Sequence, residues 1–138
     1  MTIKKIKKEI INKILNDDIV SNIYFESSNK TALRGIVYDY LTLPYGDDFI
    51  SLDISEKESG IAINKGDKTF TVLINLGFHD IHKNDENKLD LLSECIENII
   101  NDLYPGMKRY QNIPIQNKDG DGIFVYTNTI RQITFELD

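Results

Sequence analysis

Hydrophobic and polar residues alternate through positions 69–78. Because successive side chains along a strand point to opposite faces, this alternation predicts a long antiparallel strand with one buried face. Burial of one large apolar side chain stabilises a fold by roughly 1.5–3 kcal/mol, so burial of five contributes on the order of 10 kcal/mol. We therefore expect the fold to be organised around this strand. Its buried face should contain Phe70, Val72, Ile74, Leu76 and Phe78, and its wetter face Thr71, Leu73, Asn75 and Gly77.

Two segments have the spacing of amphipathic helices. Residues 3–15 repeat Ile and Leu at three- and four-residue steps behind a capping residue, Thr2, with lysines on the other side. A second helix is predicted from Asn84 or Asp85 to Pro105-Gly106, which end it. Its apolar stripe consists of Leu89, Leu92, Cys95, Ile96, Ile99, Ile100 and Leu103, and its solvated face of Asp90, Glu94, Glu97 and Asp102.

The remaining segments predict further strands and turns. The alternating residues 49–54 should pair with 69–78 in a long β-hairpin, with a charged turn at 55–60. We expect extended structure at 19–25, 36–41, 61–63, 123–126 and 130–137, a polar loop at 26–31, an irregular piece at 110–116, and turns at 117–122 and 127–129. The order predicts a single α+β domain over residues 1–138, with an antiparallel or mixed sheet built around the hairpin and two helices packed on one face.

Composition places the chain among globular proteins of a reducing compartment. Hydrophobic residues make up 41% and charged residues 28%, which is typical of a folded domain. One cysteine, Cys95, excludes an internal disulfide. The N-terminus lacks the features of a signal peptide, and no apolar run approaches the roughly 20 residues that span a bilayer. The basic helix at 3–15 has no aromatic anchor, so we expect it to pack on the domain and expect no membrane partner.

The net charge of −6 is unevenly distributed. Residues 1–13 carry five lysines and one glutamate, a balance of +4, which leaves −10 for the remainder. An acidic body argues against general or sequence-specific binding of nucleic acid and favours basic partners. The alternative is that the negative charge only keeps the protein soluble and does not attract a partner.

Residues 117–128 resemble the opening of a calcium loop. Asn117, Asp119, Asp121 and Gly122 have the spacing of such a loop, but its twelfth position is Asn128 in place of the bidentate Glu, and strand-like residues follow. We therefore expect a hairpin turn here.

Other chemical motifs are weak. His79 and His82 form a His-x-x-His pair, whereas zinc sites need three or four ligands and Cys95 is expected on the apolar face of a helix. The acid pairs Asp47-Asp48 and Asp119-x-Asp121 lie in turn contexts, and no glycine-rich phosphate loop is present. A catalytic set of Ser or Cys with His and an acid, whose members meet only in the folded structure, is an open alternative. We expect no catalytic residue, cofactor or metal, and hence a protein that is not an enzyme.

The order and spacing of these elements resemble the tail-terminator (tail-completion) proteins of long-tailed bacteriophages. The matching parts are 3–15, 36–41, 49–78, 89–104 with Pro105, and the C-terminal strand 129–137, whereas 61–63 and 110–116 have no obvious counterpart. The resemblance implies a homo-hexameric ring that ends the tail tube, stops its polymerisation and presents a surface to the head connector. It also implies a virion location after assembly in the host cytoplasm.

A ring of this kind needs one edge of each subunit to meet a different edge of the next. The candidate contact or lumen residues are Asp53, Glu56, Lys57 and Glu58, which we expect at the tip of the hairpin. Acidic loops in a lumen would repel the phosphates of passing DNA. The alternative, of equal weight, is that these residues form a solvent-exposed turn with no partner.

A second hypothesis is a small acidic inhibitor of the immunity type, which binds and blocks a basic toxin nuclease through charge complementarity. Its contact residues would be Asp90, Glu94, Glu97 and Asp102, or Asp39, Asp47 and Asp48. A third class, a small enzyme or ligand-binding domain, would need a pocket.

Overall fold

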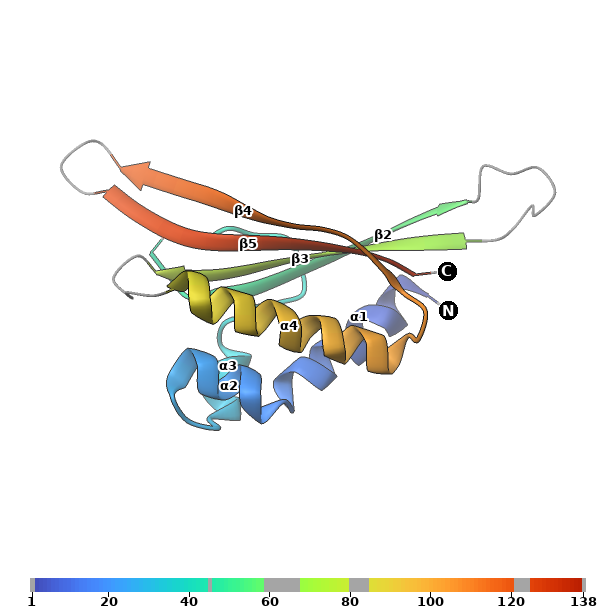
Figure 1. The fold of residues 1–138 in the computed structure, drawn as a ribbon, viewed down its shortest axis with the longest axis horizontal. Helices are drawn as coiled ribbons and strands as arrows, with labels where there is room; N and C mark the ends of the chain where they lie inside the picture. The colour runs from blue at the N-terminus through green and yellow to red at the C-terminus, as the bar shows by residue number, and fades with distance from the viewer. Residues whose placement is uncertain (1, 45, 59–67, 80–84, 121–124, 138) are drawn as a thin grey trace.

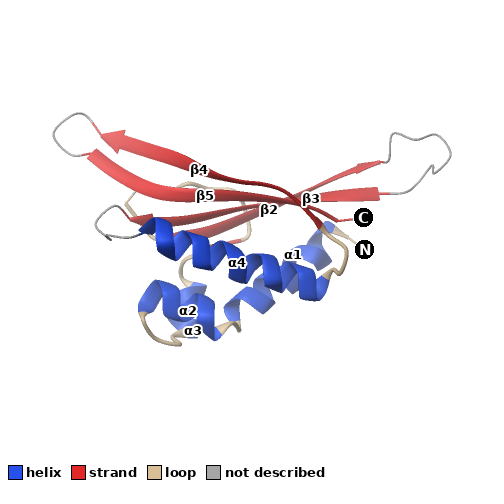
Figure 2. Cartoon of the chain, viewed as in Figure 1, coloured by secondary structure: helices blue, strands red, loops and turns tan. Residues whose placement is uncertain are grey.

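In the part of the chain that the structure describes, a five-stranded mixed sheet is covered by helices on one face (Figures 1 and 2). This computed structural model describes residues 2–44, 46–58, 68–79, 85–120 and 125–137. The predicted α+β class is confirmed. The helices are α1 (Ile3–Leu15), α2 (Asp18–Phe25), α3 (Lys30–Arg34) and α4 (Asp85–Leu103), and the strands are β1 (Val37–Tyr38), β2 (Phe49–Glu58), β3 (Lys68–His79), β4 (Lys108–Gly120) and β5 (Val125–Leu137).

The predicted organising strand, β3, lies at the centre of the sheet. The strand order is β1-β2-β3-β5-β4, with β1 parallel to β2 and every other pair antiparallel. β3 pairs with β2 from Gly77 to Lys68 and with β5 from Phe70 to His79. The predicted strand at 69–78 and its hairpin pairing with residues 49–58 are therefore confirmed.

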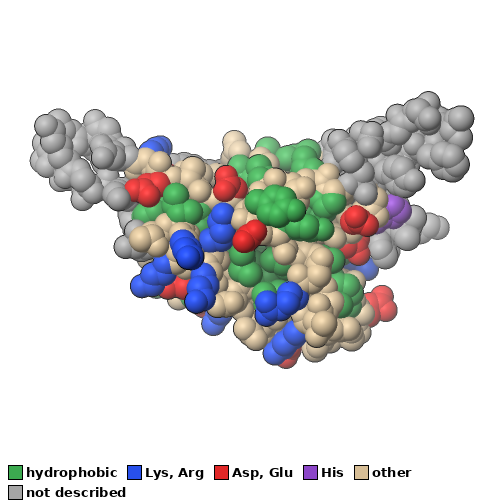
Figure 3. Space-filling model, turned by 180° about the vertical axis from the view of Figure 1, so that it is seen from behind, with side chains coloured by type: hydrophobic (Ala, Val, Ile, Leu, Met, Phe, Trp, Pro, Cys, Tyr) green, Lys and Arg blue, Asp and Glu red, His purple; other side chains and the backbone are tan. Residues whose placement is uncertain are grey.

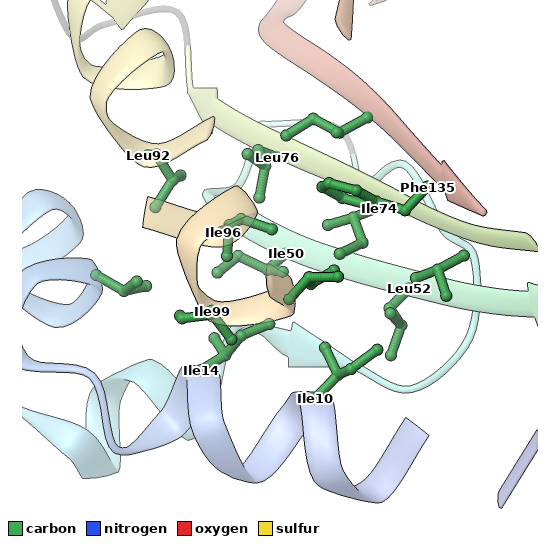
Figure 4. Packing of buried hydrophobic residues seen from close by; sticks show 14 of the residues in the cluster. Ile10, Ile14, Ile50, Leu52, Ile74, Leu76, Leu92, Ile96, Ile99 and Phe135 are labelled. Carbon is green, nitrogen blue, oxygen red and sulfur yellow. The ribbon is translucent and has the colours of Figure 1, made fainter. Parts of the chain in front are cut away.

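The helices pack on the face of β3 that was predicted to be apolar. Each of the five alternating residues of that face is at most 2% exposed. Figure 4 shows Ile14 of α1 and Ile96 of α4 pointing toward Ile50 and Ile74 of the sheet. The main core therefore lies between the helix layer and the sheet. From the helices it takes Ile6, Ile10, Ile14, Leu89, Leu92, Ile96, Ile99 and Ile100.

Specific polar contacts fix the two long helices. The Thr2 hydroxyl accepts a hydrogen bond from the Lys5 N–H at 3.2 Å, as the sequence predicted for the start of α1. The Tyr104 hydroxyl, just beyond α4, donates to the Glu9 carboxylate of α1 at 2.5 Å. Burial, and then this hydrogen bond to Glu9, raise the pKa of Tyr104 well above its usual range. The hydroxyl therefore keeps its proton near neutral pH and can donate to the carboxylate.

The first 31 residues contain two errors of prediction. Residues 19–25 were predicted to be extended, but they form the helix α2, because the Asp17 carboxylate accepts from the Val20 N–H at 3.0 Å and caps it. Its buried residues Val20 and Tyr24 are four positions apart, which is helical spacing. The predicted loop at 26–31 ends early, since Asn29 caps α3.

Strand boundaries account for the other errors. Only Val37–Tyr38 of the predicted 36–41 strand pairs with a neighbour, while β2 continues through residues 55–58, where a turn was predicted. Residues 110–116 are not irregular, and 127–129 do not interrupt β5, because β4 and β5 pair continuously apart from a shift between Arg109 and Gln111. Pro114 is tolerated because β4 is an edge strand. The predicted 61–63 strand lies outside the described residues.

The opposite face of the sheet, here called the back face, is less polar than predicted. Asn75 and Gly77 are buried on it together with Phe49 and Ile130. A Cβ atom at Gly77 would lie 2.2 Å from the Phe49 ring, so the ring packs directly against the glycine backbone. The Ser51 hydroxyl donates to the Thr42 carbonyl at 2.8 Å, which places the chain between β1 and β2 over part of this face.

Candidate interaction surface

The predicted contact residues lie along β2, not in a turn. Asp53, Glu56, Lys57 and Glu58 pair with Leu73, Phe70, Thr69 and Lys68 of β3, which corrects their predicted place at the hairpin tip. Successive strand residues point to opposite faces, so these four do not form one loop surface. Asp53, Glu56 and Lys57 are exposed. The side chain of Glu58 and the tip at 59–67 lie outside the described residues.

The outer edge of β2 is open over most of its length. β1 pairs only with Ile50 and Ser51, so residues 52–58 meet no strand on their outer side within the described chain. The Lys7 Nζ of α1 lies 3.9 Å from Asp53 Oδ1 and marks where the helix layer approaches this edge. A strand edge that meets no other strand is a template on which a further strand can pair.

A basic groove runs beside this edge along the outer side of α1. One hollow of about 310 Å³ is lined by lysines of α1, by Ile11 and Asn12, and by Asp39. Of two adjoining hollows, one shares Asn12 with it and the other shares Ile11 and Asp39, and both extend to Arg34. On the face seen from behind, Figure 3 shows Lys and Arg side chains gathered below a group of hydrophobic ones. The basic residues that line the groove are Lys4, Lys7, Lys8, Lys30 and Arg34.

The other edge of the sheet has a different character. β4 is the terminal strand, with Lys108 exposed and Ile113 40% exposed. In the helix layer, the Asp90 carboxylate of α4 lies 2.8 Å from the Arg131 guanidinium of β5, so this side of α4 faces the β5–β4 side of the sheet. Glu97 lies two turns further along the same side of the helix. The helix layer is thus basic beside β2 and acidic beside β4.

The histidine pair does not form a described metal site. His79 ends β3, and its backbone N–H donates to Asp48 Oδ1 at 2.8 Å. His82 lies outside the described residues. Within the described chain no three His, Cys, Asp or Glu side chains are grouped closely enough to bind an ion.

The calcium-like segment joins two paired strands. Asn117 pairs with Asn128 and Asp119 with Tyr126, so residues 117–120 belong to strand β4, where a turn was predicted. The two ends of the segment pair as a β4–β5 hairpin. Asp121 and Gly122 lie outside the described residues.

Cys95 is half-buried on α4 and packs against the core, as expected for a residue of the apolar stripe. Burial, and then the neighbouring charges of Asp17 and Glu94, raise the pKa of its thiol. The thiol therefore stays protonated near neutral pH and is a poor nucleophile.

Comparison with known proteins adds no assignment: no protein-family model and no curated protein matches this chain. Among the described helices, none combines the length and the apolar character required to cross a bilayer. The surface features that sequence reasoning missed are the open edge of β2, the exposed Tyr40 and Leu41 beside β1, and Ile113 on β4. Pro114 within an otherwise strand-like segment was the signal that could have identified the second edge.

Proposed function

We propose that the chain is a structural protein that assembles with itself into a closed ring at the end of a phage tail tube and joins the tail to the head connector. The observation that supports this most is the dissimilarity of the two edges of one sheet, β2 with β1 and β4. A ring is built from a heterologous contact, in which two unlike surfaces meet. A sheet with two unlike edges provides such surfaces.

The arrangement of elements also supports the proposal. The chain begins with an amphipathic helix, continues through a long hairpin and a second long helix, and ends in a long strand, in the order that the resemblance to tail terminators implies. The open groove along α1 is lined mainly by lysine, arginine and amide side chains, which suit a contact with another protein surface.

The contact residues inferred from sequence retain a place in this proposal, with a changed role. Asp53, Glu56 and Lys57 are exposed on a strand whose outer edge is open, so they would belong to a subunit contact and not to a lumen loop.

The test is a tube-capping assay. A polymerising tail-tube protein is assembled alone and with this chain, and tube lengths are measured by electron microscopy. We expect shorter tubes that carry extra density at one end, because a terminator stops addition of further subunits. An unrelated monomeric protein of similar negative charge is the control. Tubes that grow to the same length with and without the chain would contradict the proposal.

A further inference from the structure

We propose that the groove along the outer side of α1 binds a short, extended segment of a partner protein that has acidic residues at both ends and an apolar residue between them. All the residues that line the groove belong to one chain, so this inference goes beyond the proposed ring and requires no second copy.

Three hollows join to form the groove. The hollow beside the first half of α1 shares Asn12 with the hollow beside its second half. The third hollow, of about 260 Å³, shares Ile11 with the first and Leu15 with the second, and is lined on its far side by β1. The groove therefore follows α1 from Lys4 to Asn16, which spans about 18 Å at 1.5 Å per residue. An extended segment of about five or six residues has the same length.

Basic side chains line both ends of the groove. Lys4, Lys7 and Lys8 line the end beside the first half of α1. Lys30 and Arg34 of α3 line the end beside its second half. Each end therefore attracts carboxylate groups.

Three of these five cations are available to a ligand. Lys4, Lys8 and Arg34 are exposed, and none of them forms an ion pair with another described residue. The other two lie 3.9 Å from Asp53 and Asp18, neither of which lines the groove. A carboxylate bound at either end would therefore form ion pairs without displacing one already present.

The middle of the groove is apolar. Ile11 and Leu15 of α1 line it together with Val37 and Tyr40. The Tyr40 side chain is 56% exposed, and its ring lies edge to face against the ring of Tyr38, with centroids 5.7 Å apart. An apolar side chain of a ligand would cover this exposed ring, and such burial stabilises a complex.

The distance between the basic ends determines the pattern of the ligand. The lysine end is centred near residue 6 of α1, and the other end near residue 14. Eight helical residues span about 12 Å, which an extended chain covers in about four residues. Residues four apart in an extended chain point to the same side, and so does the residue midway between them. The predicted pattern is therefore acidic, any, apolar, any, acidic.

A nucleic acid fits the groove less well than such a segment. Its phosphates follow one another at every nucleotide, whereas Asp39 lines the groove beside the apolar middle. A strand that continued past the ends would meet Asp18 beside Lys30 and Asp53 beside Lys7. The whole chain carries a net charge of −6. These negative charges repel a long polyanion more than a short segment with a few carboxylates.

An NMR titration tests the groove. The isotope-labelled chain is titrated with the capped peptide Glu-Glu-Ser-Leu-Ser-Glu-Glu, in which the second residue, the central Leu and the sixth residue have the predicted spacing. The amide signals report both the binding site and the dissociation constant. We expect saturable shifts at Lys8, Ile11, Arg34 and Tyr40, which line the groove, and none at Glu94 of α4, which does not. Absence of shifts at the groove would overturn the inference.

Control peptides separate the charge from the pattern. Replacing every Glu by Gln should weaken binding about tenfold or more, because both ion-paired ends are lost. Replacing Leu by Ser should weaken it about fivefold, because the apolar middle stays uncovered. The rearranged peptide Leu-Glu-Glu-Ser-Glu-Glu-Ser has the same composition without the spacing. Equal binding of the rearranged and original peptides would overturn the inference.

A matched pair of variants tests the basic end. Lys8→Glu should weaken peptide binding about tenfold, because it removes one attraction and adds one repulsion. Lys13→Glu makes the same charge change at an exposed residue of α1 that lines none of the three hollows. It should change binding less than about twofold, since salt screens charges beyond about 8 Å. Equal losses from the two variants would assign the attraction to the whole chain and overturn the groove.

Tyr40→Ala tests the apolar middle. The variant should bind the original peptide about threefold more weakly, because part of the apolar contact is lost. It should bind the peptide with Ser in place of Leu as wild type does. Equal losses with both peptides would overturn the role of the ring.

Two further outcomes identify a different partner or a different function. Pentathymidylate carries four negative charges, as the peptide does; if it shifts the same signals at lower concentration, the groove binds nucleic acid and the inference is overturned. Peptide binding by a chain that does not shorten tail tubes would support the groove and contradict the terminator. Shortened tubes from a chain that does not bind the peptide would support the terminator and overturn the groove.

Discussion

The two faces of the sheet are built on different principles. The helix face is a continuous apolar surface in which β3 contributes five side chains that are at most 2% exposed. The back face has a small apolar group, Phe49 and Ile130 beside Gly77, surrounded by paired polar groups such as Asn75 and Gln132, whose side chains hydrogen-bond at 3.0 Å. Stability should therefore be concentrated on the first face, which leaves the edges and the back face available for contact.

The largest expected loss of stability comes from one of two adjacent residues of β3 that lie on opposite faces of the sheet. Ile74→Ala removes a fully buried side chain from the helix face and should lower the free energy of unfolding by about 2–5 kcal/mol. Leu73→Ala, on the half-buried back face, should cost less than half as much. Denaturant unfolding measures both. Equal losses would show that the faces do not differ in this way.

Gly77→Ala tests the close packing on the back face. The added Cβ would lie 2.2 Å from the fully buried Phe49 ring, which has little room to move, so we expect a loss of about 1–3 kcal/mol. In a Phe49→Ala background the same substitution should cost much less, because the clash is gone. An unchanged cost in that background would mean that the ring is not the cause.

Tyr24→Phe tests the polar contact that joins the helix layer to β2. The buried Tyr24 hydroxyl donates to the Phe49 carbonyl at 2.9 Å, and its loss should cost about 1–2 kcal/mol at neutral pH. Burial, and then Asp48, raise the pKa of Tyr24 above its ordinary value of 10.0. The fold thus favours the neutral hydroxyl, and the stability that it contributes is complete below pH 10 and is lost as pH rises further.

The difference in unfolding free energy between wild type and Tyr24→Phe should therefore shrink above pH 10. The decrease is at most about 1.4 kcal/mol per pH unit for one group. A difference that stays constant from pH 8 to 11 would contradict the assigned burial.

The smallest expected effect concerns the open edge. Asp53→Asn removes the charge that Lys7 approaches to 3.9 Å, but Asp53 is more than half exposed, so the free energy of unfolding should change by less than about 0.5 kcal/mol. Thermal unfolding would measure this change. A loss above 1 kcal/mol would assign Asp53 to the stability of the fold and not to a contact surface.

The spacing of apolar residues correctly predicted the helices and strands that bury one face against the core. The alternation of 69–78 and the helical spacing of 3–15 and 89–103 were correct because each element buries a stripe against the others. Residues 19–25 were assigned to the wrong class because a short run of β-branched and aromatic residues fits either structure, and the cap at Asp17 decided it. Residues 110–116 were misjudged because edge pairing tolerates proline.

The candidate surface was less predictable than the core. Asp53, Glu56 and Lys57 are exposed, but their position on an open edge instead of at the hairpin tip depends on how short β1 is.

The mass of the particle in solution tests the central claim most directly. Native mass spectrometry over a range of protein concentrations should show a closed assembly of six 15.9 kDa chains, with intermediates that disappear as the ring closes. A strict monomer at every concentration that forms a tight one-to-one complex with a basic protein would contradict the ring and favour the acidic-inhibitor hypothesis.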